Sequence, residues 1–199
     1  MKLLFSAATV VALSLATSAF AGNDWRSNDY AQINIGSGVA GSSRATVSGF
    51  GSASANLNPG FLGSGLVGHA FGNGVSVEGE FLYDENDIKG GAHVEAFGGL
   101  ANVKFEAPTH YHMMGTTVSP YVAGGVGYGQ SRYTVSGSSG SLSGDGVMWQ
   151  AKVGLAIHQS DKMTWDVGYR YLQLPQFSQS GLKIDTYVHG ITVGLRWGF

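Results

Sequence analysis

The sequence contains no cysteine, which excludes disulfide bonds, thiolate metal sites and a cysteine nucleophile. Charge is also scarce: Asp, Glu, Lys and Arg make up 12% of the 199 residues, where roughly 25% is usual. A soluble domain with so little charge would be hard to keep in solution. The formal net charge of −2 argues against a nucleic-acid partner.

Long apolar runs are absent from residues 22–199, so this part offers no helix with the roughly 18 apolar residues needed to cross a bilayer. A shorter apolar run stands at the start, from Leu3 to Leu15, after Lys2 and before small residues that end in Ala21. This order predicts a secretory signal peptide with an A-x-A cleavage site. We therefore expect a signal peptide over 1–21 and one domain over 22–199.

Glycine is abundant, at 32 residues, and the end of the chain alternates strictly. From Tyr187 to Phe199 the odd positions hold mostly large apolar or aromatic residues, and the even positions from Gly190 hold small or polar ones. A period of two indicates a β-strand with one apolar face. A strand of about 10 residues, apolar outside and polar inside, is the unit of a transmembrane β-barrel.

Eight segments of the chain alternate in this way, and no window has the 3.6-residue period of an amphipathic helix. The sequence therefore predicts an all-β fold, an eight-stranded antiparallel transmembrane β-barrel. The expected strands are 30–40, 61–71, 75–83, 94–105, 119–133, 147–158, 163–174 and 186–199.

The connections alternate between tight turns, at 72–74 and 159–162, and longer links, at 41–60, 84–93, 134–146 and 175–185. In barrels of the bacterial outer membrane, short turns face the periplasm and long loops face the outside. We therefore expect an outer-membrane protein with both termini in the periplasm and its long loops extracellular. The link 106–118 breaks the rule, because it is long yet falls on the side of the short turns.

Aromatic residues on the predicted outward face gather near the two ends of the strands. Between them the outward positions are mostly aliphatic or small, such as Val77, Ala101, Val103 and Val193. Two aromatic girdles around an aliphatic band fit a lipid bilayer, where amphipathic rings settle at the level of the headgroups. The girdle expected at the periplasmic ends is Phe71, Phe105, Trp165 and Trp197, and the one expected toward the extracellular ends is Tyr83, Trp149 and Tyr171.

The predicted inward face collects the charges Glu78, Glu80, Lys152, Asp166, Arg170 and Arg196. An eight-stranded barrel is just wide enough for side chains to fill it. Charges inside it must be paired, because an uncompensated buried ion costs several kcal/mol. We interpret the set as a plug of salt bridges in which Asp166 meets opposite charges on both neighbouring strands. An ion path or a gate is the functional alternative.

Two further motifs have simpler interpretations. The run 36–41 has the glycine spacing of a dinucleotide-binding loop, but that mechanism needs a helix next, and SSRATVSGFGSAS follows. We interpret these glycines as permitting barrel curvature and a loop exit. His110 and His112 would share a face if extended, but no third ligand is nearby in the sequence, and we interpret the segment as a polar turn.

The runs FGNGVSVEGEFLY, SPYVAGGVGYG, WQAKVGLAIHQSDKMTWDVGYRYL and HGITVGLRWGF resemble the outer-membrane β-barrel family of small opacity-type and porin-like surface proteins. The resemblance implies an eight-stranded barrel in the outer membrane of a Gram-negative bacterium. It also implies that Leu195, Trp197 and Phe199 belong to the C-terminal signal read by the barrel-assembly machinery. It implies no common activity, since members include adhesins and structural barrels.

Together these features predict a non-enzymatic integral outer-membrane protein with an envelope-structural or surface-interaction role. One alternative is a narrow pore for small solutes. Another is a lipid-modifying enzyme, which would need a Ser or Asp beside a His base. Asp185 and His189 are close in sequence, but we interpret them as an interfacial polar contact. We expect no cofactor and no metal. The expected partners are outer-membrane lipid or lipopolysaccharide and the barrel-assembly machinery.

Overall fold

The computed structural model describes residues 29–107, 111–113, 116–135 and 141–199, and every regular element in them is a β-strand. Within these ranges no helix has the length and apolarity needed to cross a membrane. The signal peptide predicted over 1–21 lies outside the described residues. The strands are β1 (Asp29–Val47), β2 (Gly51–Asn56), β3 (Gly60–Ala70), β4 (Val75–Ile88), β5 (Ala92–Glu106), β6 (Tyr111–Met113), β7 (Thr116–Val135), β8 (Ser141–His158), β9 (Met163–Gln173), β10 (Phe177–Gln179) and β11 (Leu182–Gly198).

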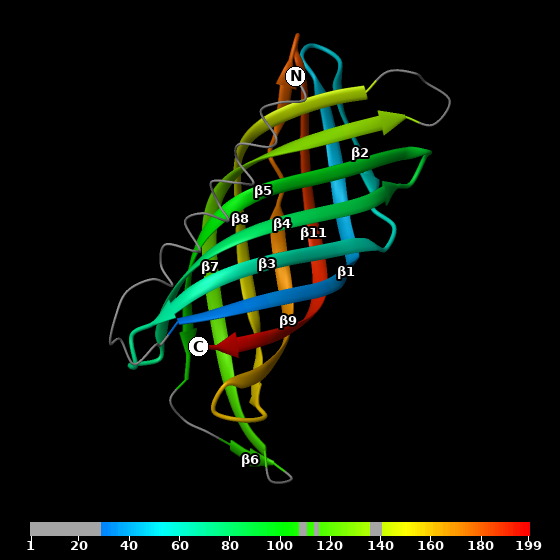
Figure 1. Cartoon of the computed structure of the whole chain (residues 1–199). Coiled ribbons are helices and arrows are strands. Elements are labelled where there is room, and N and C mark those ends of the chain that lie inside the picture. The colour runs from blue at the N-terminus through cyan, green and yellow to red at the C-terminus, as the bar shows by residue number, and fades with distance from the viewer. Residues whose placement is uncertain (1–28, 108–110, 114–115, 136–140) are drawn as a thin grey trace.

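Eight of these strands form a closed antiparallel ring (Figure 1). The ring runs β1, β3, β4, β5, β7, β8, β9, β11, and β11 pairs back onto β1 from Gly198 opposite Tyr30 to Leu182 opposite Val47. Closure satisfies the backbone groups of every ring strand on both sides, which a lipid environment requires because it supplies no water. The eight-stranded barrel predicted from the sequence is confirmed.

The barrel has two rims, named here by what they carry. The terminal rim is where β1 begins at Asp29 and β11 ends at Gly198, and it carries the turns 71–74 and 159–162. The small strand β6 pairs with the start of β7 and projects from this rim (Figure 1). It accounts for part of the long link 106–118. The side chains of His110 and His112 lie outside the described residues. The hairpin rim, at the opposite end, carries the connections 48–50, 89–91 and 180–181.

Most of the four links predicted as long loops are in fact strand, which corrects the sequence interpretation. β1 continues to Val47 and pairs with β2, while β4 and β5 are joined by only three residues. Gly90 and Gly91 close that turn at φ 114° and 86°, values that glycine adopts without steric cost. Apolar residues that face inward continue beyond the ring, as at Ile184 and Phe177, and they give the hairpins a core to pack on.

The Gly-rich strand β7 shows how the interior accommodates large side chains. Its inward positions include Gly125 and Gly129, which bring no side chain into the lumen. A Cβ at Gly125 would collide with the Asn102 side chain, and one at Gly129 would collide with the sulfur of Met148. Small residues on β7 therefore leave space for large residues of the two neighbouring strands, as close packing requires.

Candidate functional site

The interior near the middle of the barrel centres on Glu80 of β4. Its carboxylate accepts from Arg170 Nη2 at 2.6 Å and from Lys152 Nζ at 3.2 Å. Lys152 also lies 3.3 Å from Glu78, so one lysine bridges two carboxylates of the same strand. Glu78, Glu80 and Arg170 are at most 5% exposed. The amides of Gln150 and Asn102 donate to Glu80 at 2.6 and 2.9 Å, which further stabilises its buried charge.

A second cluster lies nearer the terminal rim and centres on Asp166 of β9. Lys104 Nζ approaches it at 2.9 Å and Arg196 Nε at 3.2 Å. Arg196 also reaches Glu106 at 2.9 Å, and Glu106 in turn contacts His158 at 2.9 Å. Exposure rises along this chain, from 2% for the Asp166 side chain to 28% for that of His158, so the cluster opens toward the rim.

Two buried tyrosines take part in these clusters, and one of them, Tyr30, joins the two clusters to each other. The Tyr30 hydroxyl donates to Glu78 at 2.8 Å, while the Arg196 guanidinium lies over its ring, 5.4 Å from the centroid. Lys104 Nζ lies over the Tyr121 ring at 4.3 Å, within the range of cation–π attraction. The charges and rings thus form one continuous network, defined here as the lumen charge network: Tyr30, Glu78, Glu80, Asn102, Lys104, Glu106, Tyr121, Gln150, Lys152, Asp166, Arg170 and Arg196.

The six charges predicted for the lumen all belong to this network, but one of the predicted pairings is different. Asp166 was expected to meet a cation on each neighbouring strand. Arg196 on β11 fills that role. On the other side, the register sets Asp166 opposite Ala156 and Lys152 opposite Arg170. Lys152 therefore reaches across the lumen to β4, and Lys104 of β5 reaches across to Asp166.

Lys104 and Glu106 were missed by the sequence analysis, although a signal for them existed. Ala101, Val103 and Phe105 were assigned to the outward face, so the same alternation places Asn102 and Lys104 inside. Lys104 is 2% exposed, among the most completely buried charges of the described chain. Nothing in the sequence indicated its partner, because Lys104 and Asp166 are 62 residues apart.

Toward the hairpin rim the interior changes character and becomes apolar. Leu82, Met148 and Leu172 are completely buried. They belong to an interior cluster of inward-facing side chains from several strands, defined here as the apolar core: Leu57, Leu82, Val94, Ala96, Leu100, Tyr133, Met148, Leu172, Leu174, Phe177, Ile184 and Val188. Asp84 and Asn86 also face inward on β4, and the Asn86 amide donates to Asp84 at 2.6 Å.

Interior side chains at successive depths, from Asp166 through Glu80 to Leu82 and Leu172, are at most 3% exposed. A continuous water-filled channel would leave the residues that line it accessible to water. The described interior is instead packed, as the width of an eight-stranded barrel allows.

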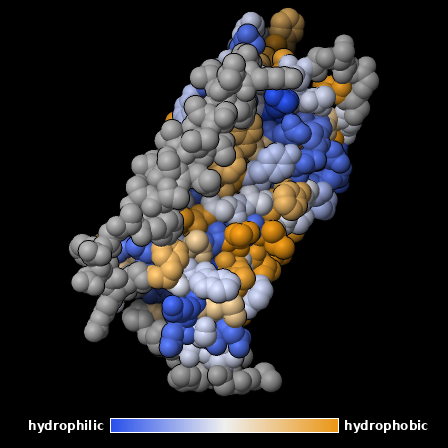
Figure 2. All heavy atoms as spheres, viewed as in Figure 1, coloured by the Kyte–Doolittle hydropathy of each residue, from blue (hydrophilic) through white to orange (hydrophobic). Residues whose placement is uncertain are grey.

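The residues predicted for the two aromatic girdles lie on the outer wall. At the terminal rim Phe71, Phe105, Trp165 and Trp197 are 41–56% exposed. Toward the hairpin rim Trp149 lies beside Tyr171, with ring centroids 5.0 Å apart, and Tyr83 is half-buried. Exposed aliphatic residues such as Val77, Val103 and Val193 lie between the two levels. Figure 2 shows hydrophobic residues across the middle of the visible wall and hydrophilic ones nearer its ends.

The three residues expected to form an assembly signal lie at the terminal rim, Leu195 and Trp197 on the outside of β11 and Phe199 just after its end. Trp197 and Phe199 are 56% and 39% exposed, and Leu195 is half-buried. Asp185 and His189, the pair considered for a lipid-modifying enzyme, each contact other residues. His189 is hydrogen-bonded to the hydroxyl of Tyr169, and Asp185 is engaged by Gln176 and Lys183.

One group of side chains on the β4–β5 hairpin has the spacing of metal ligands. Single ligand atoms of Glu85, His93 and Glu95 lie within 4.8 Å of one another. His93 also contacts Asp87 at 2.9 Å, and Arg132 lies 3.9 Å from Glu95. The Arg132 guanidinium thus already offsets part of the carboxylate charge.

Residues 5–199 match the family described as the outer membrane protein beta-barrel domain. A protein of Gluconacetobacter diazotrophicus, described as an outer membrane protein, is 28% identical over 151 residues, which are 66% of this chain. The match covers 40% of that relative's length.

Two solved structures are similar in fold. The crystal structure of Neisserial surface protein A is similar at a TM-score of 0.56 and 17% identity, over 87% of this chain and 98% of that one. The outer membrane protein OprG from Pseudomonas aeruginosa is similar at a TM-score of 0.53 and 14% identity, over 85% of this chain and 95% of that one. At such identities the likeness concerns the fold alone.

Proposed function

Because this chain belongs to the outer membrane protein beta-barrel domain family, we propose that it is a closed, non-enzymatic barrel that contributes to envelope structure and presents its hairpins at the cell surface. The observation that carries this proposal is the filled interior. The lumen charge network and the apolar core follow one another along the barrel, and their central side chains are almost wholly buried. Such an interior favours a structural role over conduction.

The proposed orientation places the terminal rim in the periplasm and the hairpin rim outside the cell. The short turns 71–74 and 159–162 support it, since short turns are periplasmic in bacterial barrels. Outer-membrane lipid would surround the wall between the girdles. Leu195, Trp197 and Phe199 would be presented to the barrel-assembly machinery from the outer face of β11.

The absence of native cysteine makes this orientation directly testable. Ser52→Cys places a thiol on β2 at the hairpin rim, and Ser160→Cys places one in a turn at the terminal rim. On intact cells, a membrane-impermeant maleimide should label the first variant and leave the second unlabelled until the outer membrane is permeabilised. Labelling of Ser160→Cys alone on intact cells would reverse the orientation.

A conductance measurement tests the closed interior. The purified protein, inserted in planar bilayers, is expected to give no reproducible single-channel steps above the background of the bilayer. Heat-dependent migration on a denaturing gel confirms that the same preparation is folded. Steps that change in size when Arg170 or Lys152 is replaced by Ala would overturn the proposal in favour of a narrow pore, because both side chains occupy the lumen.

A lipid-modifying activity is the remaining alternative. The separate contacts of His189 and Asp185 speak against an acyl-transfer pair, which needs a nucleophile within hydrogen-bond reach of its base. Mass spectrometry of lipid A from cells with and without the protein decides the matter. An unchanged profile is expected, and a lost or gained acyl chain would contradict the non-enzymatic assignment.

A further inference from the structure

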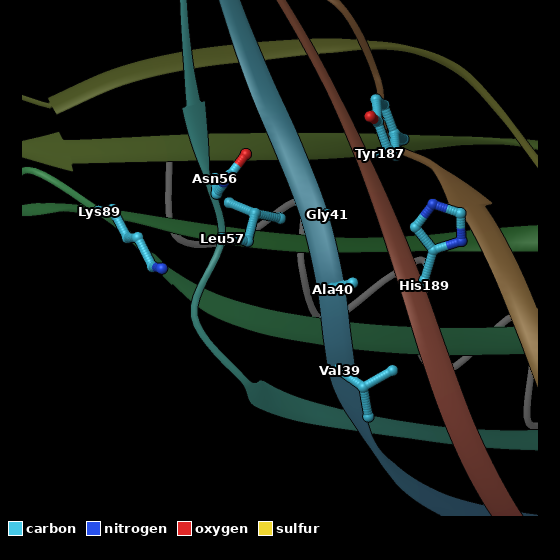
Figure 3. Close-up of a pocket in the computed structure, with 8 residues that line it drawn as sticks. All are labelled: Val39, Ala40, Gly41, Asn56, Leu57, Lys89, Tyr187 and His189. Atoms are coloured by element: carbon cyan, nitrogen blue, oxygen red, sulfur yellow. The ribbon is translucent and has the colours of Figure 1, made fainter.

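The outer wall of the barrel is hollowed below the hairpin rim, where β1 meets β11. The hollow has a volume of about 330 Å³. Figure 3 shows Asn56 and Lys89 on one side of β1, and Tyr187 and His189 on the other side, on β11. Val39 and Ala40 of β1 lie between the two groups. The hollow is called the wall pocket below.

Two interruptions of the sheet create the wall pocket. On one side, the β1–β11 register shifts between Gly38 and Ala40, as a β-bulge does. On the other side, β2 ends at Asn56 and β3 begins only at Gly60. A bulge bends a strand and re-aims its side chains, so the wall is indented where the two interruptions flank β1.

The hairpin side of the pocket is cationic. Lys89 is exposed, and its backbone N–H donates to the Asn56 carbonyl at 2.9 Å, which ties the two lining residues together. Arg44 is exposed further along β1, opposite Asp185 on β11, and Lys183 lies near the same carboxylate. Asp87, two residues before Lys89, is engaged by His93. Three cations, Arg44, Lys89 and Lys183, thus stand against two carboxylates, Asp87 and Asp185, and an anionic group would be attracted.

Toward the terminal rim the wall below the pocket is a continuous aliphatic track. Ile33 and Ile35 of β1 are 70% and 61% exposed. Ile35 pairs with Val193 of β11, and Ile191 is exposed at 52% beside them. The pocket itself supplies hydrogen-bonding groups in Asn56, Tyr187 and His189. From the hairpin rim toward the terminal rim, the wall along β1 and β11 is thus cationic, then polar, then apolar. An anionic lipid has the same order, from its charged group through its polar headgroup to its acyl chains.

We propose that the wall pocket binds lipopolysaccharide, with a phosphate of its lipid A at Lys89, its sugar at Asn56 and Tyr187, and an acyl chain along the track of Ile33, Ile35 and Val193. This rests on the orientation proposed above, which sets the pocket at the level of the outer leaflet. A sugar fits the pocket because its hydroxyls can form hydrogen bonds with the amide of Asn56 and the phenol of Tyr187. An acyl chain fits the track because its dispersion contacts with aliphatic side chains are not directional.

The experiment is native mass spectrometry of the detergent-solubilised full-length barrel titrated with purified bisphosphorylated lipid A. Dephosphorylated lipid A and phosphatidylglycerol are titrated in parallel. Lys89→Gln should weaken lipid A binding by about fivefold to tenfold, the worth of one exposed charge-assisted hydrogen bond. Ala40→Trp, which fills the pocket, should weaken it further. Lys162→Gln, which removes the same charge at the terminal rim, should leave it unchanged.

Folding of each variant is checked by its heat-dependent gel migration, and Lys89→Arg should retain binding. Equal affinity for dephosphorylated lipid A overturns the phosphate contact and with it the proposal. The proposal is also overturned if phosphatidylglycerol binds as tightly as lipid A. It is overturned as well if Lys89→Gln and Ala40→Trp both bind lipid A as tightly as the wild type does. Since maleimide labelling and conductance report orientation and closure independently, a failure here is distinct from a failure of the proposed function.

Discussion

The two halves of the barrel interior are filled by side chains of opposite character. Toward the terminal rim, Glu80, Asp166 and their cations form directional contacts in which each charge has particular partners. Toward the hairpin rim, Leu82, Met148 and Leu172 pack through apolar contacts, which are not directional. The wall around the first half carries the lipid-facing band, whereas the second half extends into hairpins that stand in water under the proposed orientation.

This difference indicates that the two halves are stabilised in different ways. Removing apolar surface from water stabilises the hairpin half at about 25 cal/mol per Å², so that half can hold hairpins together beyond the membrane. The charged half gains little from burial itself, because desolvation offsets most of the Coulomb attraction. Its contacts instead depend on geometry, and we expect that half to be sensitive to the loss of any single partner.

The largest effect is expected from Glu80→Gln, which leaves Arg170 buried without its carboxylate. Removing one partner of a buried ion pair costs about 3–5 kcal/mol in the free energy of unfolding. Urea titration in lipid vesicles, followed by tryptophan fluorescence, measures it. The double variant Glu80→Met with Arg170→Met should recover most of the loss. If the single variant is as stable as the wild type, the two halves do not differ as described.

A somewhat smaller loss is expected from Leu172→Ala in the apolar core, at about 2–5 kcal/mol, because it removes transfer free energy and leaves a cavity. The same urea titration applies. Leu142→Ala is the matched control, since Leu142 is 41% exposed near the hairpin rim and should cost far less. Similar losses for the two leucines would mean that the hairpin half has no tight core.

The alternation that assigns residues to the interior or to lipid is tested by Val193→Arg. An arginine on the lipid face near the bilayer midplane costs about 2–4 kcal/mol. Val193→Leu, which keeps the site apolar, should be close to neutral. Partition of the two variants into lipid vesicles, with urea unfolding, separates them. If Val193→Arg is as stable as the wild type, the face that carries Val193 lies inside the barrel and the assigned register is wrong by one residue.

The smallest effect is expected from Glu95→Gln, which removes a charge pair that lies in water. Arg132 is 3.9 Å away, and both side chains are more than a third exposed. Such a pair contributes about 0–1 kcal/mol, and salt screens it. Urea titration at low and high salt should therefore show little change. A loss as large as that of Glu80→Gln would contradict the contrast between buried and exposed pairs.

The strands and their faces could be predicted because a period of two in the sequence maps directly onto the two sides of a sheet. All eight expected strands match ring strands, and the outward positions at Val77, Val103 and Val193 are exposed as assigned. Toward the hairpin rim most strands extend further than expected, as β1 does to Val47 and β8 does from Ser141. Ser, Gly and Ala in 41–56 carry no apolar alternation, so nothing local distinguished a paired strand from a loop.

Contacts across the lumen could not be predicted in the same way. The alternation puts Lys104, Lys152 and Asp166 inside, but which of them meet depends on the stagger of strands around the ring. That stagger sets Lys152 opposite Arg170 and sends it to Glu80, 72 residues away. The wall pocket beside the β1 bulge was not predicted either. The glycines of 36–41 indicated curvature, but not the gap after Asn56 that lies beside it.

The sequence by itself determined that this chain is a membrane barrel, because lipid outside and packed side chains inside impose a period of two on the residue types of every strand. The tertiary structure alone decided which charges neutralise one another, where the interior turns from ionic to apolar, and where the wall is indented. The reason is physical: side-chain alternation is a local property of a strand, whereas a partner across the lumen and a gap between two interruptions exist only once the ring has closed.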